Sequence, residues 1–351
     1  MKRAFRLISI RFPTVLRSVE SDGSGAIYPH PSRNHDDILI KIGKPEYIAA
    51  PRTLLLRYPR LEMISSPIGS EPLSTAPKTQ TWKLVLSYDG TEFHGWQVQP
   101  TQQTVQGELS DAIERITGER VLPQGSGRTD AGVHALAQVA SFPLVAPIPA
   151  ANLQRALNRT LPAAIRIHSA EVASESFHAR HSAIGKTYEY RIFRGEICPP
   201  SLARYVFALN WPLDISAMQH AASVVLGEHD FSSFAATDPD LTQRSSVPPP
   251  DEPTNIRTIF ESAWHHSPDH NGDLLIYRVR GSRFLHHMVR NLVGTFLDAG
   301  RGHIRAQAIR DILNARNRSA AGATAPARGL FLVAVDYPHP ASPNASDANL
   351  K

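Results

Sequence analysis

A single loop, from Gly125 to Ala135, constrains this chain more than any other stretch of its sequence. It holds three glycines, one arginine and one aspartate within eleven residues. Because glycine admits backbone conformations closed to other residues, the stretch predicts a shaped loop that presents the carboxylate of Asp130. Asp and Gly are also common in turns, and an isolated Asp-x-Gly would indicate only a turn. The complete run is more specific than that and favours a functional loop.

The segments around this loop show helical and strand patterns in turn. Just before it, Thr104 fits a helix N-cap, one apolar face follows, and Gly118 fits the C-terminal cap. Further helices are predicted over residues 152–158, from Asp214 as cap to Gly227, and over 284–297 and 306–313. Strands are predicted over residues 82–88, 138–142, 166–172, 186–194, 256–264, 274–280 and 330–337. Because these elements lack regular βαβ spacing, the predicted fold class is α+β.

The two halves of this part of the chain contain similar elements, which predicts two related lobes. We place the N-terminal lobe, with the Asp130 loop, at residues 81–185 and the C-terminal lobe at residues 186–340. Residues 239–254 are polar and rich in proline, which predicts a loop. Residues 341–351 are predicted to form a disordered tail.

Residues 1–80 differ from the rest. They open with five basic residues before the first acidic one, Glu20, and continue with scattered prolines and no sustained periodicity, which predicts a disordered extension. Such an acid-poor, arginine-rich start is typical of an organellar transit peptide, here residues 1–18. We favour a start codon assigned too early, with Met63 as the true start, because the later motifs look bacterial. An RNA-binding arm is a third interpretation, and only the charge supports it.

Composition excludes several classes of protein. The only cysteine is Cys198, so no disulfide can form within the chain, and no apolar run approaches the roughly 18 residues of a membrane span. We therefore expect a cytoplasmic protein. The net charge of +5 comes from residues 1–80, because the remainder carries equal numbers of acidic and basic residues. Nearly all basic residues of the remainder are arginines, which suits RNA, although a GC-rich genome would produce the same bias.

Six blocks of sequence together point to a known family. Residues 127–134 read Gly-Arg-Thr-Asp-Ala-Gly-Val-His. The other blocks lie at residues 88–97, at 177–180 with 186–190, at 284–294 and at 329–335. In their order along the chain, they resemble the tRNA pseudouridine synthase A family over residues 82–338. The resemblance implies two lobes with mixed, largely antiparallel sheets flanked by helices, with the active-site cleft between them.

The resemblance also implies an activity. Members of the family isomerise uridine to pseudouridine in the anticodon stem-loop of tRNA, at positions 38, 39 and 40. The uracil leaves C1′, rotates and rejoins through C5, on a nucleotide flipped out of the stack, because these atoms are inaccessible inside a stem. The implied partners are tRNA and a second copy of the chain, in a homodimer, and no cofactor or membrane is implied.

Five residues match functional positions of the family. Asp130 would be the catalytic carboxylate, and Arg128 would help to flip the base. Tyr188 would pack on the target base, Leu330 would lie under the uracil, and Arg290 would be the partner of Asp130. The residues themselves leave the route open: Asp130 can attack the sugar or the base, or take a proton from C2′.

Each supporting residue also has an ordinary structural interpretation. Tyr188 and Leu330 fit strand packing. Arg128 can pair with the carboxylate, contact RNA or lie on the surface. Arg290 lies about 140° from the apolar face of its predicted helix, so it can face a cleft or bulk solvent.

We expect no metal site in this chain. His286 and His287 would diverge on a helix, and Pro268 between His266 and His270 opposes a helical pair there, so a polar turn between strands is predicted instead. Two other functions are weighed against the synthase. An RNA-binding protein that lost its chemistry would not need intact site residues. A hydrolytic glycosidase or nuclease would need a second carboxylate or metal ligands.

Overall fold

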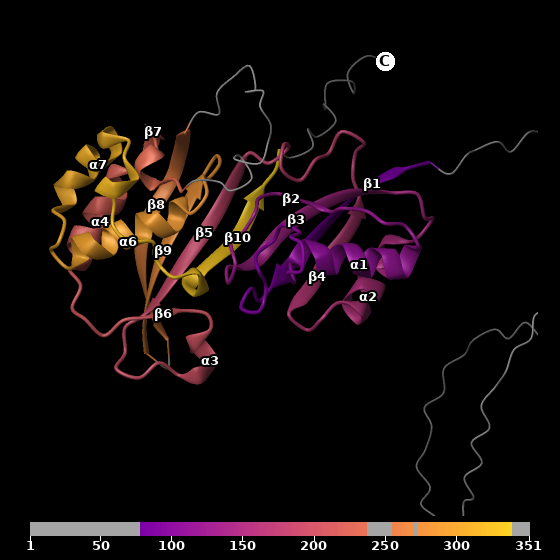
Figure 1. Cartoon of the computed structure of the whole chain (residues 1–351), viewed down its shortest axis with the longest axis horizontal. Coiled ribbons are helices and arrows are strands. Elements are labelled where there is room, and N and C mark those ends of the chain that lie inside the picture. The colour runs from indigo at the N-terminus through magenta and orange to yellow at the C-terminus, as the bar shows by residue number, and fades with distance from the viewer. Residues whose placement is uncertain (1–77, 237–254, 270–271, 339–351) are drawn as a thin grey trace, which may run out of the picture. The chain divides into compact units, whose positions relative to one another are not determined.

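The structure, a computed structural model, describes residues 78–236, 255–269 and 272–338. Within these ranges a 10-stranded sheet has the order β4-β1-β3-β10-β5-β9-β8-β7, with β2 paired to β3 and β6 paired to β5 (Figure 1). Its strand pairs are antiparallel except for β10 with β3 and β5 with β6. The α+β class and the mixed, largely antiparallel sheet flanked by helices are therefore confirmed.

The strands are β1 (Gln80–Tyr88), β2 (Gln124–Gly125), β3 (His134–Leu144), β4 (Ile165–Val172), β5 (Gly185–Phe193), β6 (Phe207–Ala208), β7 (Gly227–Asp230), β8 (Ile256–Asp269), β9 (Gly272–Gly281) and β10 (Leu330–Asp336). The helices are α1 (Val105–Thr117), α2 (Ala150–Thr160), α3 (Pro200–Ala203), α4 (Ile215–Val224), α6 (Met288–Gly300) and α7 (Ile309–Ala315). Helix α2 packs on β4, whereas α4 packs on β8 and on α6 (Figure 1). None of the helices in the described ranges is long and apolar enough to cross a membrane.

Strand β10 joins the two halves of the sheet. It runs parallel to β3, with Phe331 opposite His134, and antiparallel to β5, with Leu332 opposite Tyr188. The sheet is therefore continuous across the predicted boundary between residues 185 and 186, which falls at the start of β5. As a result, a strand near the end of the chain lies beside the strand that leaves the Asp130 loop.

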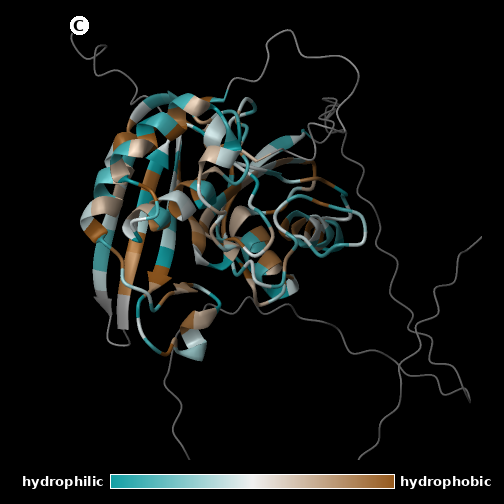
Figure 2. Ribbon diagram, turned by 60° about the vertical axis from the view of Figure 1, so that its left-hand side comes forward, coloured by the Kyte–Doolittle hydropathy of each residue, from teal (hydrophilic) through white to brown (hydrophobic). Residues whose placement is uncertain are grey.

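Local patterns predicted most of these elements. Helix α1 has the predicted caps: the Thr104 side chain accepts a hydrogen bond from the Gly107 amide, and Gly118 is left-handed with φ 76°. Buried and partly exposed residues alternate along β1, and Figure 2 shows both hydrophobic and hydrophilic residues on the strands. The short elements β2, β6, β7 and α3 escaped prediction because two to four residues carry no detectable period.

Several boundaries were predicted wrongly, and three of them moved an element or residue. Helix α4 ends at Val224, and Gly227, with φ 91°, instead begins β7. Strand β8 continues to Asp269 because its pairing with β9 extends to Gly272, so His266 lies in a strand and not in a polar turn. Helix α6 begins at Met288 and not at residue 284. The apolar residues before Met288 also pack on the core, so periodicity could not mark where the helix begins.

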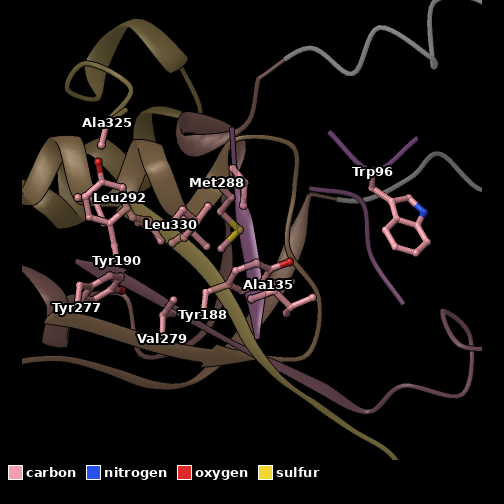
Figure 3. Close-up of a cluster of buried hydrophobic side chains, with 14 of the residues drawn as sticks. Trp96, Ala135, Tyr188, Tyr190, Tyr277, Val279, Met288, Leu292, Ala325 and Leu330 are labelled. Atoms are coloured by element: carbon pink, nitrogen blue, oxygen red, sulfur yellow. The ribbon is translucent and has the colours of Figure 1, made fainter. Parts of the chain in front are cut away.

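One hydrophobic core extends along the described part of the chain, from β1 to β10. Figure 3 shows the part of it that lies around Tyr188, Tyr190, Leu292 and Leu330. These residues come from β5, α6 and β10, so the core itself connects the candidate site residues. The predicted extension before residue 78, the loop at 239–254 and the tail at 341–351 lie outside the described residues.

Candidate active site

The loop with Asp130 connects β2 to β3. Its tip is a tight turn, in which the Val133 amide donates to the Asp130 carbonyl oxygen at 3.1 Å and Gly132 has φ 77°. A residue with a side chain would be strained at that φ. The motif therefore does form a turn in the backbone. Within that turn the Asp130 side chain is 20% exposed.

Two glycines let the segment after β1 pack directly on this loop. A Cβ atom on Gly90 would lie 2.0 Å from the Val133 carbonyl oxygen, and one on Gly95 would lie 2.6 Å from that of Thr129. The Trp96 amide donates to the same Thr129 oxygen at 3.0 Å. Backbone contacts this close explain why glycine occupies both positions, and they hold the loop from one side.

A buried network of polar side chains holds the loop from the other side. The Tyr88 hydroxyl and the Thr129 hydroxyl are hydrogen-bonded at 2.8 Å. Gln138 of β3 accepts from the Ser126 hydroxyl at 2.7 Å and donates to the Gly127 carbonyl oxygen at 2.9 Å. Burial raises the pKa of Tyr88 to about 12, so its hydroxyl keeps the proton it shares. The residues on both sides of Arg128 are thus fixed, while Arg128 itself is exposed.

Sequence reasoning gave Gln138 no role, although a signal was present. Gln138 is fully buried in a strand whose next inward positions, Ala140, Phe142 and Leu144, are apolar. An uncharged polar side chain is buried at little cost only when it is hydrogen-bonded, so its position indicates a network. The partners of that network come from β1 and from the loop, and the sequence alone could not name them.

Arg290 of α6 meets Asp130 across 160 residues of sequence. Its Nη1 lies 2.9 Å from Asp130 Oδ2, and its Nε donates to the Ala325 carbonyl oxygen at 2.8 Å. The guanidinium is largely buried, and a charge-assisted hydrogen bond in such surroundings is strong and directional. The structure therefore brings together the two residues that the family pattern pairs.

His286 and His287 also face the carboxylate. Their Nε2 atoms lie 3.5 Å from Asp130 Oδ1 and 3.3 Å from Oδ2, respectively, and the two rings have centroids 4.0 Å apart. The prediction that they diverge on a helix is wrong, because both precede α6 and His287 is left-handed with φ 60°. Burial lowers the pKa of His287, and Asp130 opposes this shift. Both histidines were missed as neighbours of Asp130.

Tyr188 of β5 and Leu330 of β10 lie in the hydrophobic core. Tyr188 is buried, and its ring meets that of Phe284 edge-on at 5.0 Å. Burial, together with the negative charge of Asp130, raises the pKa of Tyr188, so its hydroxyl stays protonated. Leu330 is buried in the same core, opposite Tyr190 in the β10–β5 register (Figure 3).

Comparison with known proteins identifies what these residues belong to. The sequence model of a family described as tRNA pseudouridine synthase matches residues 84–182 and 221–338. The tRNA pseudouridine synthase A of Solibacter usitatus is 50% identical over 255 residues, which are 73% of this chain and 98% of that protein. The protein of the same name from Maridesulfovibrio salexigens is 43% identical, over 74% of this chain and 90% of its own length. That from Thermoanaerobacter sp. is 40% identical, over 72% of this chain and 98% of its own length.

The chain belongs to the tRNA pseudouridine synthase family. This confirms the resemblance found in the sequence, and with it the isomerase class that the family carries. The match covers both halves of the continuous sheet, including β3, which follows the Asp130 loop, and β10.

A cluster of basic residues lies beside the loop, and it was not predicted from the sequence. Lys186 of β5 is buried, and a Cβ atom on Gly127 would lie 3.3 Å from its Cε. Burial, reinforced by the nearby charges of Arg180 and Arg283, lowers the pKa of Lys186 to about 8. A signal was available, because Lys186 occupies an inward-facing strand position two residues before Tyr188.

A cavity of about 240 Å³ also adjoins the loop, and Asp89, His134 and Tyr205 are among its lining residues. His134 accepts from the Gly90 amide at Nδ1, at 3.0 Å, and its Nε2 lies 3.1 Å from the Arg204 carbonyl oxygen. Burial lowers the pKa of His134, which keeps the ring neutral in this arrangement. Both ring nitrogens are thus used in holding the end of the loop, so this histidine is structural.

Proposed function

We propose that this chain isomerises uridine to pseudouridine in the anticodon stem-loop of tRNA, at positions 38, 39 and 40, with Asp130 as the catalytic carboxylate. One observation carries the proposal: Asp130 lies at the tip of a loop held on both sides, 2.9 Å from Arg290 and beside the buried Tyr188. A catalytic group must be held in its productive geometry, and this loop has the necessary contacts.

The groups around Asp130 suit transfer of the uracil better than hydrolysis of its glycosidic bond. Within the described part of the chain, the guanidinium of Arg290 and the imidazoles of His286 and His287 contact the carboxylate. Hydrolytic glycosidases pair their catalytic carboxylate with a second one about 5–10 Å away. An arrangement in which cationic or neutral donors surround a single carboxylate favours the isomerase over the glycosidase alternative.

The supporting residues divide the remaining tasks. Arg290 orients the carboxylate and balances its charge. Tyr188 and Leu330 offer the uracil a flat aromatic and an apolar contact, and Arg128, exposed on the loop, is placed to enter the stack when the base flips out. Lys186, with Arg180 and Arg283, supplies positive charge for the RNA backbone next to the site. We propose a homodimer as well, and the family resemblance supports it.

Tritium release from tRNA labelled at C5 of uridine tests this function directly, because the reaction replaces that hydrogen. We expect release by the wild-type chain and none by Asp130→Asn, with little change in tRNA affinity, since the substitution removes charge and almost no volume. Asp111→Asn, an exposed carboxylate on α1, is the matched control and should retain activity.

The same assay separates the alternatives. Substrates with uridine at only one of positions 38, 39 and 40 locate the modified nucleotide. Binding without any tritium release by the wild type would favour an RNA-binding protein without chemistry, and release of free uracil would favour a glycosidase. Full activity of pure Asp130→Asn protein would overturn the assignment of Asp130.

A further inference from the structure

Three potential metal ligands converge at the site. Among the described residues, one ligand atom each from Asp130, His286 and His287 lies within 4.8 Å of the other two. Zinc in a tetrahedral site lies about 2.0–2.2 Å from nitrogen and oxygen ligands, which places those ligands roughly 3.3–3.5 Å apart. The His286 Nε2 atom is already 3.5 Å from Asp130 Oδ1, and the His287 Nε2 atom is 3.3 Å from Oδ2. Small rotations of the side chains would complete the geometry.

We propose that Asp130, His286 and His287 form an inhibitory binding site for Zn²⁺. Imidazole nitrogen and carboxylate oxygen are ligands that this metal prefers. All three side chains are between a fifth and a third exposed, so an ion can enter from solvent and keep water in the fourth position. The inhibition, but not the binding, rests on the proposed function, because a carboxylate bound to metal is no longer available to the uridine.

Arg290 makes this a reversible site and not a resident metal centre. Its guanidinium lies 2.9 Å from Asp130 Oδ2, so a dication at the carboxylate experiences repulsion from a fixed positive charge. Oδ1, the oxygen nearest His286, offers the metal a second position. Binding is therefore weaker than at a structural zinc site of four ligands, and chelators should remove the ion readily.

Binding is tested without activity by titrating the full chain with Co²⁺, which reports nitrogen and oxygen ligands by its visible absorption. We expect one saturable site from which Zn²⁺ displaces Co²⁺. His286→Gln, His287→Gln and Asp130→Asn should each weaken Co²⁺ binding about tenfold or more. His181→Gln is the matched control, because the His181 ring also lies tilted beside that of a neighbouring histidine, His178, with centroids 4.3 Å apart. Unchanged Co²⁺ affinity in all three ligand variants, with unfolding curves that show them folded, would overturn the site.

Inhibition is tested by tritium release at increasing Zn²⁺, with each variant normalised to its own metal-free rate. Wild type and His181→Gln should be inhibited at the same Zn²⁺ concentration and recover with EDTA. Half-inhibition of His286→Gln and His287→Gln should need about tenfold more Zn²⁺ or more. Equal sensitivity of all four proteins would refute the proposal. A wild type that binds Co²⁺ as described but releases no tritium without metal would instead refute the proposed function and leave the metal site standing.

Discussion

The hydrogen bond between Tyr88 and Thr129 offers the sharpest test of how the loop positions its carboxylate. Both hydroxyls are buried and lie 2.8 Å apart, and Thr129 directly precedes Asp130 in the chain. Tyr88→Phe removes one partner and leaves the Thr129 hydroxyl without it. Leaving a buried polar group unsatisfied costs about 1–3 kcal/mol, so we expect the free energy of unfolding to fall by that amount.

The effect on turnover should exceed the effect on stability. Thr129 is adjacent to Asp130, and a displacement of about 1 Å in a reacting group can reduce a rate on the order of a hundredfold. Gln138 still donates to the Gly127 carbonyl oxygen in this variant, so the loop shifts without detaching. We expect kcat to fall between about tenfold and a hundredfold, with tRNA affinity nearly unchanged.

The double variant Tyr88→Phe/Thr129→Val separates a lost contact from an unsatisfied group. Removing both partners avoids the desolvation penalty, so the double variant should be more stable than the sum of the single variants implies, by about 1 kcal/mol. Denaturant unfolding measures stability, and single-turnover tritium release measures the rate. Tyr277→Phe is the control, because it loses a buried 2.8 Å bond to Ser262 on β8 and should lose stability without a selective loss of kcat. Additive stability losses, or unchanged kcat in Tyr88→Phe, would refute the role of the network.

The remaining predictions concern the charged residues of the site and the role of metal. Arg290→Ala should chiefly lower the single-turnover rate, whereas Arg128→Ala should chiefly impair capture of the flipped base, and a wild-type rate in either variant removes that residue from the site. The pKa of Lys186 is lowered to about 8, so its charge is lost as pH rises through that value. The tRNA affinity of the wild type, measured by filter binding, should therefore fall between about pH 7 and pH 9. Lys186→Met should bind weakly at every pH, whereas an unaltered pH profile would contradict this role. The same lowered pKa means that the unfolded chain binds more protons above pH 8, so the contribution of Lys186 to stability rises with pH. Prolonged EDTA treatment should leave turnover intact once tRNA folding is controlled, and activity restored only by one specific metal would show a metal requirement.

Local sequence was enough to determine the parts of this protein that depend on neighbours in the chain. Thr104 and Gly118 delimit α1 because caps act through hydrogen bonds within one turn. The glycine-rich motif predicted the Asp130 loop because backbone freedom is a property of single residues. Family motifs then pointed to five candidate site residues, including Arg290 on an element far from the loop.

Tertiary structure alone decided which groups meet at the carboxylate. The insertion of β10 between β3 and β5 brings the two halves of the sheet together, and no periodicity encodes that pairing. His286 and His287 reach Asp130 because α6 begins later than its apolar spacing indicates. Gln138 and Lys186 looked like ordinary strand residues until their neighbours were known. Local propensity acts over a few residues, whereas these contacts depend on packing between segments up to 160 residues apart, which only the folded chain specifies.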